Sequence, residues 1–216
     1  MLLVSEIFSS IEGEGIRAGY PATFIRLFGC NLRCTYCDSM YACEGNEFVK
    51  MSIDEILSVV DAMHNKRVTL TGGEPLIHKN VHELVTALLG KDYEVNIETN
   101  GAVHIAPYAH LKNVIITMDF KCTDSGMREK MIYDNFFHLR AKDVLKFVVG
   151  SREDLYDMLN IVKAFDGVNA QVFVSPVFCK IEPAEIVDFL KEHKLQDVRL
   201  QLQLHKFIWE PQKRGV

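Results

Sequence analysis

Three cysteines lie close together in the sequence and could bind a metal ion or a metal cluster. Cys30, Cys34 and Cys37 form a CxxxCxxC pattern. Thiolates are the usual ligands of iron-sulfur clusters, and a cubane cluster ordinarily takes four of them, one for each iron. Three cysteines would therefore leave one iron free for another ligand. The spacing also allows a zinc site with Cys43 as the fourth ligand, or three free buried thiols.

Three polar segments follow apolar runs that are rich in β-forming residues. They are Thr71-Gly72-Gly73-Glu74-Pro75, Glu98-Thr99-Asn100-Gly101 and Asp119-Phe120-Lys121. The glycines of the first segment would let a ligand approach the main chain closely, although an ordinary strand-to-helix turn has the same composition. The polar side chains of the other two could bind a ligand, or could cap a turn and form a solvated ion pair.

The elements that must position these residues alternate between strands and helices. We expect strands at 22–28, 67–71, 94–99, 114–119, 144–149, 170–174 and 198–204. We expect helices at 52–63, 81–89, 152–165 and 183–193, the first of which opens with a capping box at Ser52 and Glu55. This alternation is typical of parallel strands joined by helical crossovers.

The length of the chain limits how many such units it can hold. A complete eight-unit barrel needs about 250 residues, and the chain has 216. We therefore predict an α/β fold, an incomplete (β/α) barrel with a mainly parallel sheet of six or seven strands, formed by residues 1–216 as a single domain. Chemistry in parallel α/β folds gathers at the carboxyl ends of the strands, so the cysteine loop and the polar segments should meet there.

Composition and charge exclude some classes of partner. The net charge is -5 and the pI is about 5.9, so the chain lacks the positive surface expected of a nucleic-acid-binding protein. The first ten residues, MLLVSEIFSS, have no basic region, and no apolar stretch approaches the roughly 20 residues that span a bilayer. We expect no membrane contact, a cytoplasmic location and reduced thiols, since three of the six cysteines lie within eight residues.

The cysteine loop followed by Gly72-Gly73-Glu74-Pro75 resembles the radical S-adenosylmethionine superfamily. In that superfamily, CxxxCxxC binds a 4Fe-4S cluster whose fourth iron is chelated by S-adenosylmethionine. The resemblance implies that the reduced cluster cleaves this cofactor to give a 5'-deoxyadenosyl radical, which removes a hydrogen atom from the substrate. An activase that installs a glycyl radical on a partner protein would share these motifs, and a non-catalytic zinc module is a further alternative.

Other segments are similar to the 7-carboxy-7-deazaguanine synthase family. They are Ser10-Ile11-Glu12-Gly13-Glu14-Gly15, the run 24–31, Cys37-Asp38-Ser39 and Gln203-Leu204-His205-Lys206. This resemblance implies a radical ring contraction of 6-carboxy-5,6,7,8-tetrahydropterin to 7-carboxy-7-deazaguanine with loss of ammonia, in the biosynthesis of queuosine and related deazapurines. It also implies a homodimer and an electron donor such as flavodoxin or ferredoxin.

The same resemblance assigns roles to individual residues. The pterin would be bound by Ile11, Glu12, Gly13, Arg26 and Thr71, and Mg²⁺ by Ser39. S-adenosylmethionine would be bound by Tyr36, Cys37, Asp38, Gly73, Asp119, Phe120, Lys121, Ser175, Pro176, Val177 and Phe178. Arg26 also has a chemical rationale, because a guanidinium pairs with a carboxylate through two parallel hydrogen bonds.

Two positions depart from the family pattern, and for two further regions the sequence allows more than one role. Glu12 stands where the family usually has glutamine, and Asp119-Phe120-Lys121 stands where it often has Ser-Pro-Lys. His205 could face the substrate or be structural. The segment beyond His205 could help to close the pocket. Cys43, Cys122 and Cys179 are most simply buried or incidental thiols.

Overall fold

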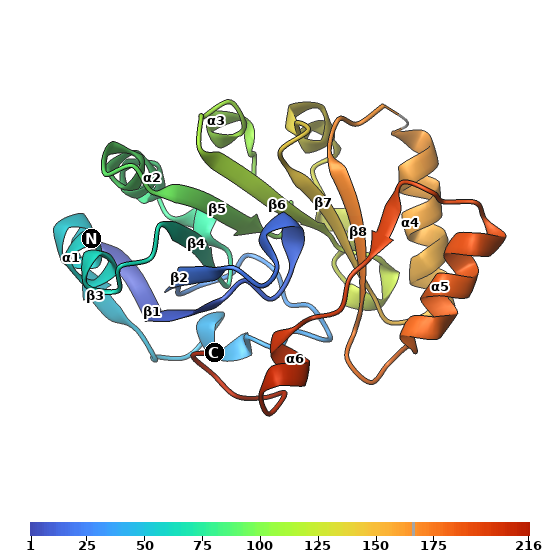
Figure 1. The fold of residues 1–216 in the computed structure, drawn as a ribbon, viewed down its shortest axis with the longest axis horizontal. Coiled ribbons are helices and arrows are strands. Elements are labelled where there is room, and N and C mark those ends of the chain that lie inside the picture. Colours follow the sequence, from blue (N-terminus) through green and yellow to red (C-terminus); the bar gives the residue numbers. More distant parts are fainter. Residues whose placement is uncertain (166) are drawn as a thin grey trace.

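The computed structural model describes residues 1–165 and 167–216 and contains a nine-stranded sheet in the order β3-β1-β2-β4-β5-β6-β7-β8-β9 (Figure 1). The strands are β1 (Leu2–Ile11), β2 (Pro21–Leu27), β3 (Val49–Met51), β4 (Arg67–Gly72), β5 (Glu94–Thr99), β6 (Val114–Phe120), β7 (Val144–Val149), β8 (Gln171–Pro176) and β9 (Val198–Leu200). Neighbours from β2 to β9 run parallel, whereas β1 pairs antiparallel with both β2 and β3. The sheet is curved and unclosed, which confirms the predicted incomplete barrel.

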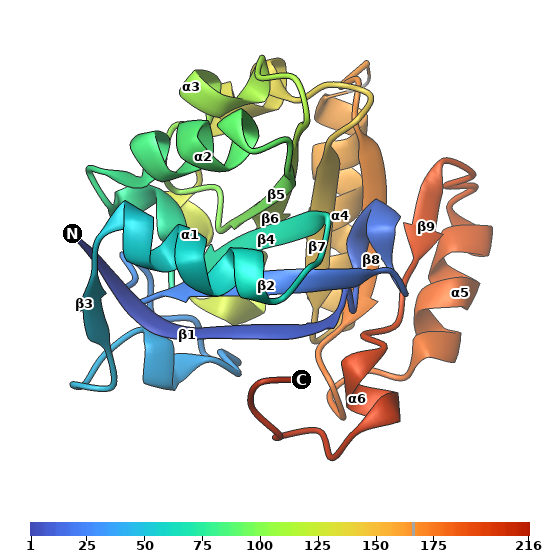
Figure 2. The same cartoon turned by 60° about the vertical axis from the view of Figure 1, so that its left-hand side comes forward.

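The helices α1 to α5 cover the outer face of this curved sheet, whereas α6 lies near the C-terminus at its open side (Figures 1 and 2). They are α1 (Ile53–Ala62), α2 (Val81–Gly90), α3 (Ala106–Ala109), α4 (Arg152–Ala164), α5 (Pro183–Glu192) and α6 (His205–Ile208). The predicted capping box is confirmed, because Ser52 accepts a hydrogen bond from the Glu55 backbone and Glu55 accepts one from the Ser52 backbone. Gly90 is the last residue of α2, and Pro183 is the first residue of α5, where its missing N–H costs no helical hydrogen bond.

The strand predictions were correct for the parallel part and incomplete for the rest. The seven predicted strands correspond to β2, β4, β5, β6, β7, β8 and β9. The prediction missed β1 and β3, so the sheet has nine strands rather than six or seven. It also extended β9 to residue 204, whereas the strand ends at Leu200 and His205 begins α6.

The two faces of the parallel strands differ in polarity because side chains alternate along each strand. Leu70, Ile97 and Ile116 are fully buried in the apolar core that includes residues of the covering helices. The intervening positions carry Thr69, Thr71, Asn96, Glu98 and Thr117, and hydrogen bonds join Thr117 to Asn96 and Thr69 to Glu12. The inner face of the barrel is therefore polar.

Contacts between distant segments bridge the open side of the barrel. Gln201 exchanges two hydrogen bonds with the backbone of Gly15, and Leu204 donates its backbone N–H to Gly13. The segment after α6 then returns to the cysteine loop, where Arg214 lies 3.7 Å from the ring centroid of Tyr41 and pairs with Glu47 at 2.9 Å (Figures 1 and 2). Residues far apart in the sequence thus form one wall of the barrel.

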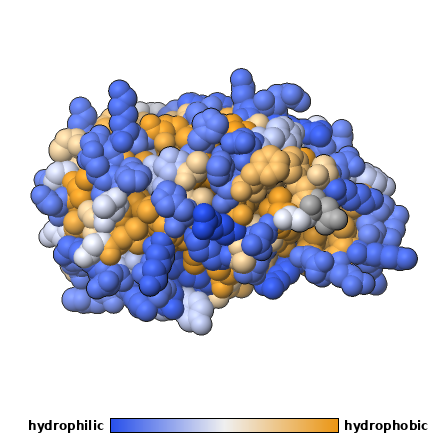
Figure 3. Space-filling model, turned by 90° about the horizontal axis from the view of Figure 1, so that it is seen from above, coloured by the Kyte–Doolittle hydropathy of each residue, from blue (hydrophilic) through white to orange (hydrophobic). Residues whose placement is uncertain are grey.

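The outer surface carries apolar areas separated by hydrophilic side chains, as the face in Figure 3 shows. Phe137 is the most exposed large apolar side chain in the part of the chain that the structure describes, and Phe207 and Ile208 are also more than half exposed. None of the described helices is long and apolar enough to cross a membrane.

Candidate active site

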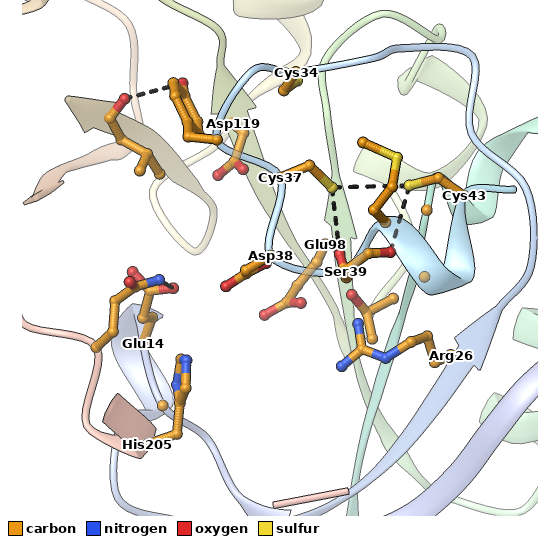
Figure 4. Close-up of a pocket in the computed structure, with 18 of the residues that line it drawn as sticks. Glu14, Arg26, Cys34, Cys37, Asp38, Ser39, Cys43, Glu98, Asp119 and His205 are labelled. Carbon is orange, nitrogen blue, oxygen red and sulfur yellow. Dashed lines mark hydrogen bonds between the residues drawn. The ribbon is translucent and has the colours of Figure 1, made fainter. Parts of the chain in front are cut away.

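A cavity of about 860 Å³ opens at the carboxyl ends of the parallel strands (Figure 4). It is lined by the cysteine loop, by the residues that follow β4, β5, β6 and β8, and by the segment 211–216. The four motifs that the sequence placed at strand ends therefore meet around one space, as expected.

The strand register explains why polar side chains from different strands face this cavity together. Arg26 of β2 is aligned with Thr71 of β4, and Asp119 of β6 is aligned with Lys146 of β7. Aligned residues on neighbouring parallel strands point to the same face of a sheet. All four line the cavity, and Lys146 Nζ lies 3.2 Å from Asp119 Oδ1.

The three cysteines of the CxxxCxxC loop line one wall and are half-buried. Hydrogen bonding with Cys43 lowers the pKa of Cys30 and of Cys37 to about 6 each, whereas burial raises the pKa of Cys34. The thiolate is the form that binds iron. Three thiols that face a cavity, two of them easily ionised, fit an iron-sulfur cluster with one iron open to another ligand.

Cys43 also borders the cavity, but it is more buried than the other three thiols. It is 6% exposed, and its Sγ is 3.9 Å from Cys37 Sγ and 3.5 Å from the carbonyl oxygen of Ser39. A closed zinc site would bring four sulfurs to within about 3.8 Å of one another. Among the described residues, no three of these four cysteines bring their sulfurs within 4.8 Å of one another. The zinc alternative is therefore not supported.

Glycines let the backbone approach the site where side chains would not fit. A Cβ on Gly73 would lie 2.4 Å from the carbonyl oxygen of Gly29 and 2.8 Å from Cys30 Cβ. A Cβ on Gly13 would lie 2.5 Å from His205 Nδ1. Gly73 thus packs the turn after β4 directly against the cysteine loop, and Gly13 makes room for the imidazole that lines the cavity.

Arg26 is held by an ion pair and still presents part of its guanidinium group to the cavity. Its Nε lies 2.7 Å from Glu6 Oε1, which also accepts a hydrogen bond from the Tyr41 hydroxyl at 2.7 Å. Its two terminal nitrogens make no hydrogen bond within residues 1–165 and 167–216. These nitrogens are available to pair with an anionic group.

A network of buried charges forms the wall between β6 and β7. Lys146 pairs with Glu14 at 3.1 Å and with Asp119, which also pairs with Lys121 at 2.7 Å. Burial alone would raise the pKa of Asp119, but the charges of Lys121 and Lys146 hold it below its usual range. Ser175 and Gln203 donate further hydrogen bonds to Glu14. Asp119 is therefore an ionised acceptor beside the cysteine loop.

Two neighbouring residues after Cys37 place oxygen atoms at the cavity. Asp38 Oδ2 lies 3.2 Å from Lys206 Nζ, and Ser39 Oγ lies 3.9 Å from Cys37 Sγ. Both residues line the cavity and Figure 4 shows them beside Glu98 and Arg26. Hydroxyl, carboxylate and water oxygens are the ligands that Mg²⁺ prefers.

Most residues that the resemblance selected line this cavity, but four do not. Those that do are Ile11, Gly13, Arg26, Cys30, Cys34, Tyr36, Cys37, Asp38, Ser39, Thr71, Gly73, Asp119, Lys121, Val177 and Phe178. Phe120 packs in the core against Phe136 and Phe147, and the buried Ser175 hydroxyl donates to Glu14. Pro176 is the last residue of β8 and does not line the cavity either.

Glu12 is the fourth of these residues, and its side chain points toward the amino ends of the strands. It is 1% exposed, and it accepts a hydrogen bond from Thr69, which precedes Thr71 by two positions on β4. Its backbone N–H and C=O bond to Tyr20 and Gly19. The substitution of glutamate for the usual glutamine therefore lies beneath the cavity and not in its lining.

Several lining residues were not selected from the sequence. Glu14 and Lys146 line the cavity, and Glu6, outside the lining, holds Arg26. The segment beyond His205, for which the sequence left a closing role open, lines the cavity at Pro211–Val216. Glu6 and Lys146 could have been recognised in the sequence as candidate site residues. Each interrupts an otherwise apolar run, LLVSEIF for Glu6 and VLKFVV for Lys146. A charge in the middle of a buried strand requires a partner or a polar cavity.

Comparisons with known proteins agree with this geometry. Residues 24–192 match the model of the Radical SAM superfamily. A protein of Clostridium acetobutylicum named 7-carboxy-7-deazaguanine synthase is 46% identical over 217 residues, covering 99% of this chain and 98% of that protein. A protein of the same name from Methanospirillum hungatei is 38% identical, covering 96% of this chain and 86% of that protein. The fold is similar to the crystal structure of QueE from Escherichia coli, with a TM-score of 0.76 at 23% sequence identity. The match covers 94% of this chain and 93% of the QueE chain.

Proposed function

This chain belongs to the Radical SAM superfamily and within it to the 7-carboxy-7-deazaguanine synthase family, and we propose that its cavity carries out that family's reaction. The substrate is 6-carboxy-5,6,7,8-tetrahydropterin, and the product is 7-carboxy-7-deazaguanine, formed by ring contraction with loss of ammonia. The observation that carries this proposal is that Cys30, Cys37 and the free terminal nitrogens of Arg26 open into the same cavity.

The cysteine wall would hold the cofactors. Cys30, Cys34 and Cys37 bind a 4Fe-4S cluster, which with S-adenosylmethionine supplies the radical that removes hydrogen from the substrate. Lining residues near this wall bind S-adenosylmethionine, namely Tyr36, Asp38, Gly73, Asp119, Lys121, Val177 and Phe178. Asp119, kept ionised by two lysines, accepts hydrogen bonds from ligand hydroxyl groups.

A second group of cavity residues would bind the pterin. Arg26 pairs with the substrate carboxylate, and its ion pair with Glu6 fixes the orientation of the guanidinium plane. Thr71 and the backbone of Ile11 and Gly13 contact the ring system. Glu12 stabilises the floor beneath through Thr69 and Arg17, and not through contact with the substrate.

Magnesium would bind beside the substrate carboxylate. Ser39 offers one hydroxyl, which is sufficient because Mg²⁺ keeps several of its waters and takes further oxygens from the substrate. The position of Ser39 in the cavity lining, on the same side as Arg26 in Figure 4, supports this role.

Four further features belong to the proposal. The chain acts as a single domain, which its one continuous sheet supports. It forms a homodimer, for which Phe207 and Ile208 offer exposed apolar surface. It receives electrons from a donor such as flavodoxin or ferredoxin, and it works in the cytoplasm, where its six thiols stay reduced.

One assay tests the reaction directly. Anaerobically purified protein carrying about four irons and four sulfides per chain is incubated with reductant, S-adenosylmethionine, magnesium and 6-carboxy-5,6,7,8-tetrahydropterin. We expect mass spectrometry to detect 7-carboxy-7-deazaguanine. Fully loaded protein that leaves the pterin unchanged would refute the proposal, and a colourless protein that binds zinc in place of iron would refute the cluster.

A further inference from the structure

Asn100 is buried beside the cysteine loop with its side-chain amide in a fixed orientation. It is 7% exposed and follows β5. Its Oδ1 accepts a hydrogen bond from the backbone N–H of Ala102 at 2.9 Å, so the Nδ2 side of the amide must face the other way. That side donates to Asn31 Oδ1 at 2.8 Å and to Cys30 Sγ at 3.7 Å.

The backbone of Asn100 is fixed as well. Its N–H donates to the Glu74 carboxylate at 2.6 Å, and Glu74 is itself fully buried. Glu74 also accepts hydrogen bonds from Thr99 and from the backbone of Leu76. The amide that reaches Cys30 therefore does not need to reorganise when the sulfur changes its charge.

The three thiols of the loop differ in the donors that surround them. Cys30 Sγ receives N–H groups from Asn100 and, at 3.4 Å, from the backbone of Leu32. Cys37 Sγ has the Ser39 hydroxyl and the Cys43 thiol, each at 3.9 Å. Cys34 Sγ receives no hydrogen bond from the described residues. Among the described residues, Cys30 is thus the only one of the three whose sulfur receives a side-chain amide N–H.

We propose that Asn100 is a positioning residue that sets the reduction potential of the cluster through its N–H···S hydrogen bond to Cys30. Reduction adds negative charge to the cluster, and part of this charge resides on the ligating sulfurs. A donor aimed at one of them stabilises the reduced form more than the oxidised form and so raises the potential. Burial strengthens the effect because little water screens it. The inference rests on the proposed cluster at this site.

The test is the midpoint potential of the cluster, measured by redox titration followed by electron paramagnetic resonance in anaerobic protein without S-adenosylmethionine. Asn100→Ala removes the donor, and Asn100→Asp replaces it with an acceptor of the same shape. We expect both variants to have a more negative midpoint, with the equilibrium constant for one-electron reduction lowered about tenfold, or about 59 mV, in the alanine variant.

Thr99→Val is the matched control. It removes a hydrogen bond to the same Glu74 carboxylate from the neighbouring residue without touching Cys30, so its midpoint should equal that of the unsubstituted protein. An unchanged midpoint in Asn100→Ala would overturn the proposal, as would an equal shift in Thr99→Val. Folded Asn100 variants that bind no cluster at all would also overturn it, since Asn100 would then hold the cluster and not tune it.

These outcomes are separate from the failure of the proposed function. Unsubstituted protein that loads a cluster but makes no 7-carboxy-7-deazaguanine would refute the reaction and leave the potential measurement valid. Unsubstituted protein without iron would refute the cluster itself, before any variant is compared.

Discussion

The carboxylate of Glu74 accepts a hydrogen bond from the backbone N–H of Asn100 at 2.6 Å, so the turn after β4 fixes the turn after β5. Burial raises the pKa of Glu74 to about 7 although three donors surround it. The Gly-Gly-Glu-Pro segment therefore joins two strand ends, and its glutamate is a structural residue.

Removal of this carboxylate should destabilise the fold. Glu74→Ala leaves the N–H groups of Asn100 and Leu76 and the Thr99 hydroxyl without their acceptor, at a cost of about 3 kcal/mol or more. Glu74→Gln keeps one acceptor oxygen, so its free energy of unfolding should lie between those of Glu74→Ala and the unsubstituted protein. Urea unfolding at pH 8 measures the difference. An alanine variant whose free energy of unfolding stays within about 1 kcal/mol of the unsubstituted protein would contradict this role.

Glu12 should make the stability depend on pH. Burial, with the nearby charge of Glu98, raises its pKa from 4.5 to about 7. The folded protein therefore holds this proton more tightly than the unfolded chain, and its contribution to stability, complete below pH 4.5, is lost as the pH rises through 7.

Glu12→Gln should remove this contribution. The difference in free energy of unfolding between the variant and the unsubstituted protein should change by about 3 kcal/mol between pH 4.5 and pH 8, in favour of the variant at high pH. Glu74 titrates in the same range in both proteins, so only the difference is informative. Parallel pH curves would show that Glu12 is not the group responsible.

Gly73 should be required for the cysteine loop to accept its cluster. Gly73→Ala places a Cβ 2.4 Å from a backbone oxygen, which cannot move away as a flexible side chain could. We expect iron content after anaerobic reconstitution to fall several-fold. Gly90→Ala is the matched control, because a Cβ there meets nothing within 4 Å. Equal iron content in the two variants would show that the loop adapts.

Arg26 should determine the affinity for the carboxylated pterin. Arg26→Lys loses the two parallel donors, and we expect the dissociation constant measured by anaerobic calorimetry to rise about 10- to 100-fold. Arg67→Lys serves as control, since Arg67 stacks on Tyr20 and pairs with Glu94 away from the cavity lining. Unchanged affinity in the Arg26 variant would remove this residue from substrate binding.

Ser39 should make the reaction respond to magnesium. Ser39→Ala removes the one hydroxyl that we propose as a protein ligand, so the magnesium concentration for half-maximal activity should rise about tenfold or more. Cys43→Ser is a useful comparison, because it changes a buried polar group that contacts the Ser39 backbone and leaves the Ser39 hydroxyl in place. An equal magnesium response in the unsubstituted protein and the Ser39 variant would refute the assignment.

The sequence predicted the motifs that follow strands better than the contacts between strands. Gly73, Asp119 and Lys121 were placed correctly because each comes directly after an apolar run, and parallel strands bring their carboxyl ends together. The pairing of Lys146 with Asp119 depends on the register of β6 and β7, which no local pattern specifies.

The missed strands have a similar cause. β3 has three residues, two of them exposed, and it exists because Leu2–Val4 offers it an edge. β1 contains a register shift between Val4 and Glu6, which disturbs the regular alternation by which a strand is recognised. The direction of the Glu12 side chain, toward Thr69 and outside the cavity lining, depends on these pairings and could not be read from the motif alone.

The hydrogen bonds between Gly15 and Gln201 join residues 186 positions apart. At about 5–20 residues per second of synthesis, roughly 10–40 s separate the emergence of the two partners from a ribosome. The cysteine loop is thus made early, and the wall that shields it is made late. Until the residues near the C-terminus are made, the CxxxCxxC segment of the nascent chain stays uncovered on that side.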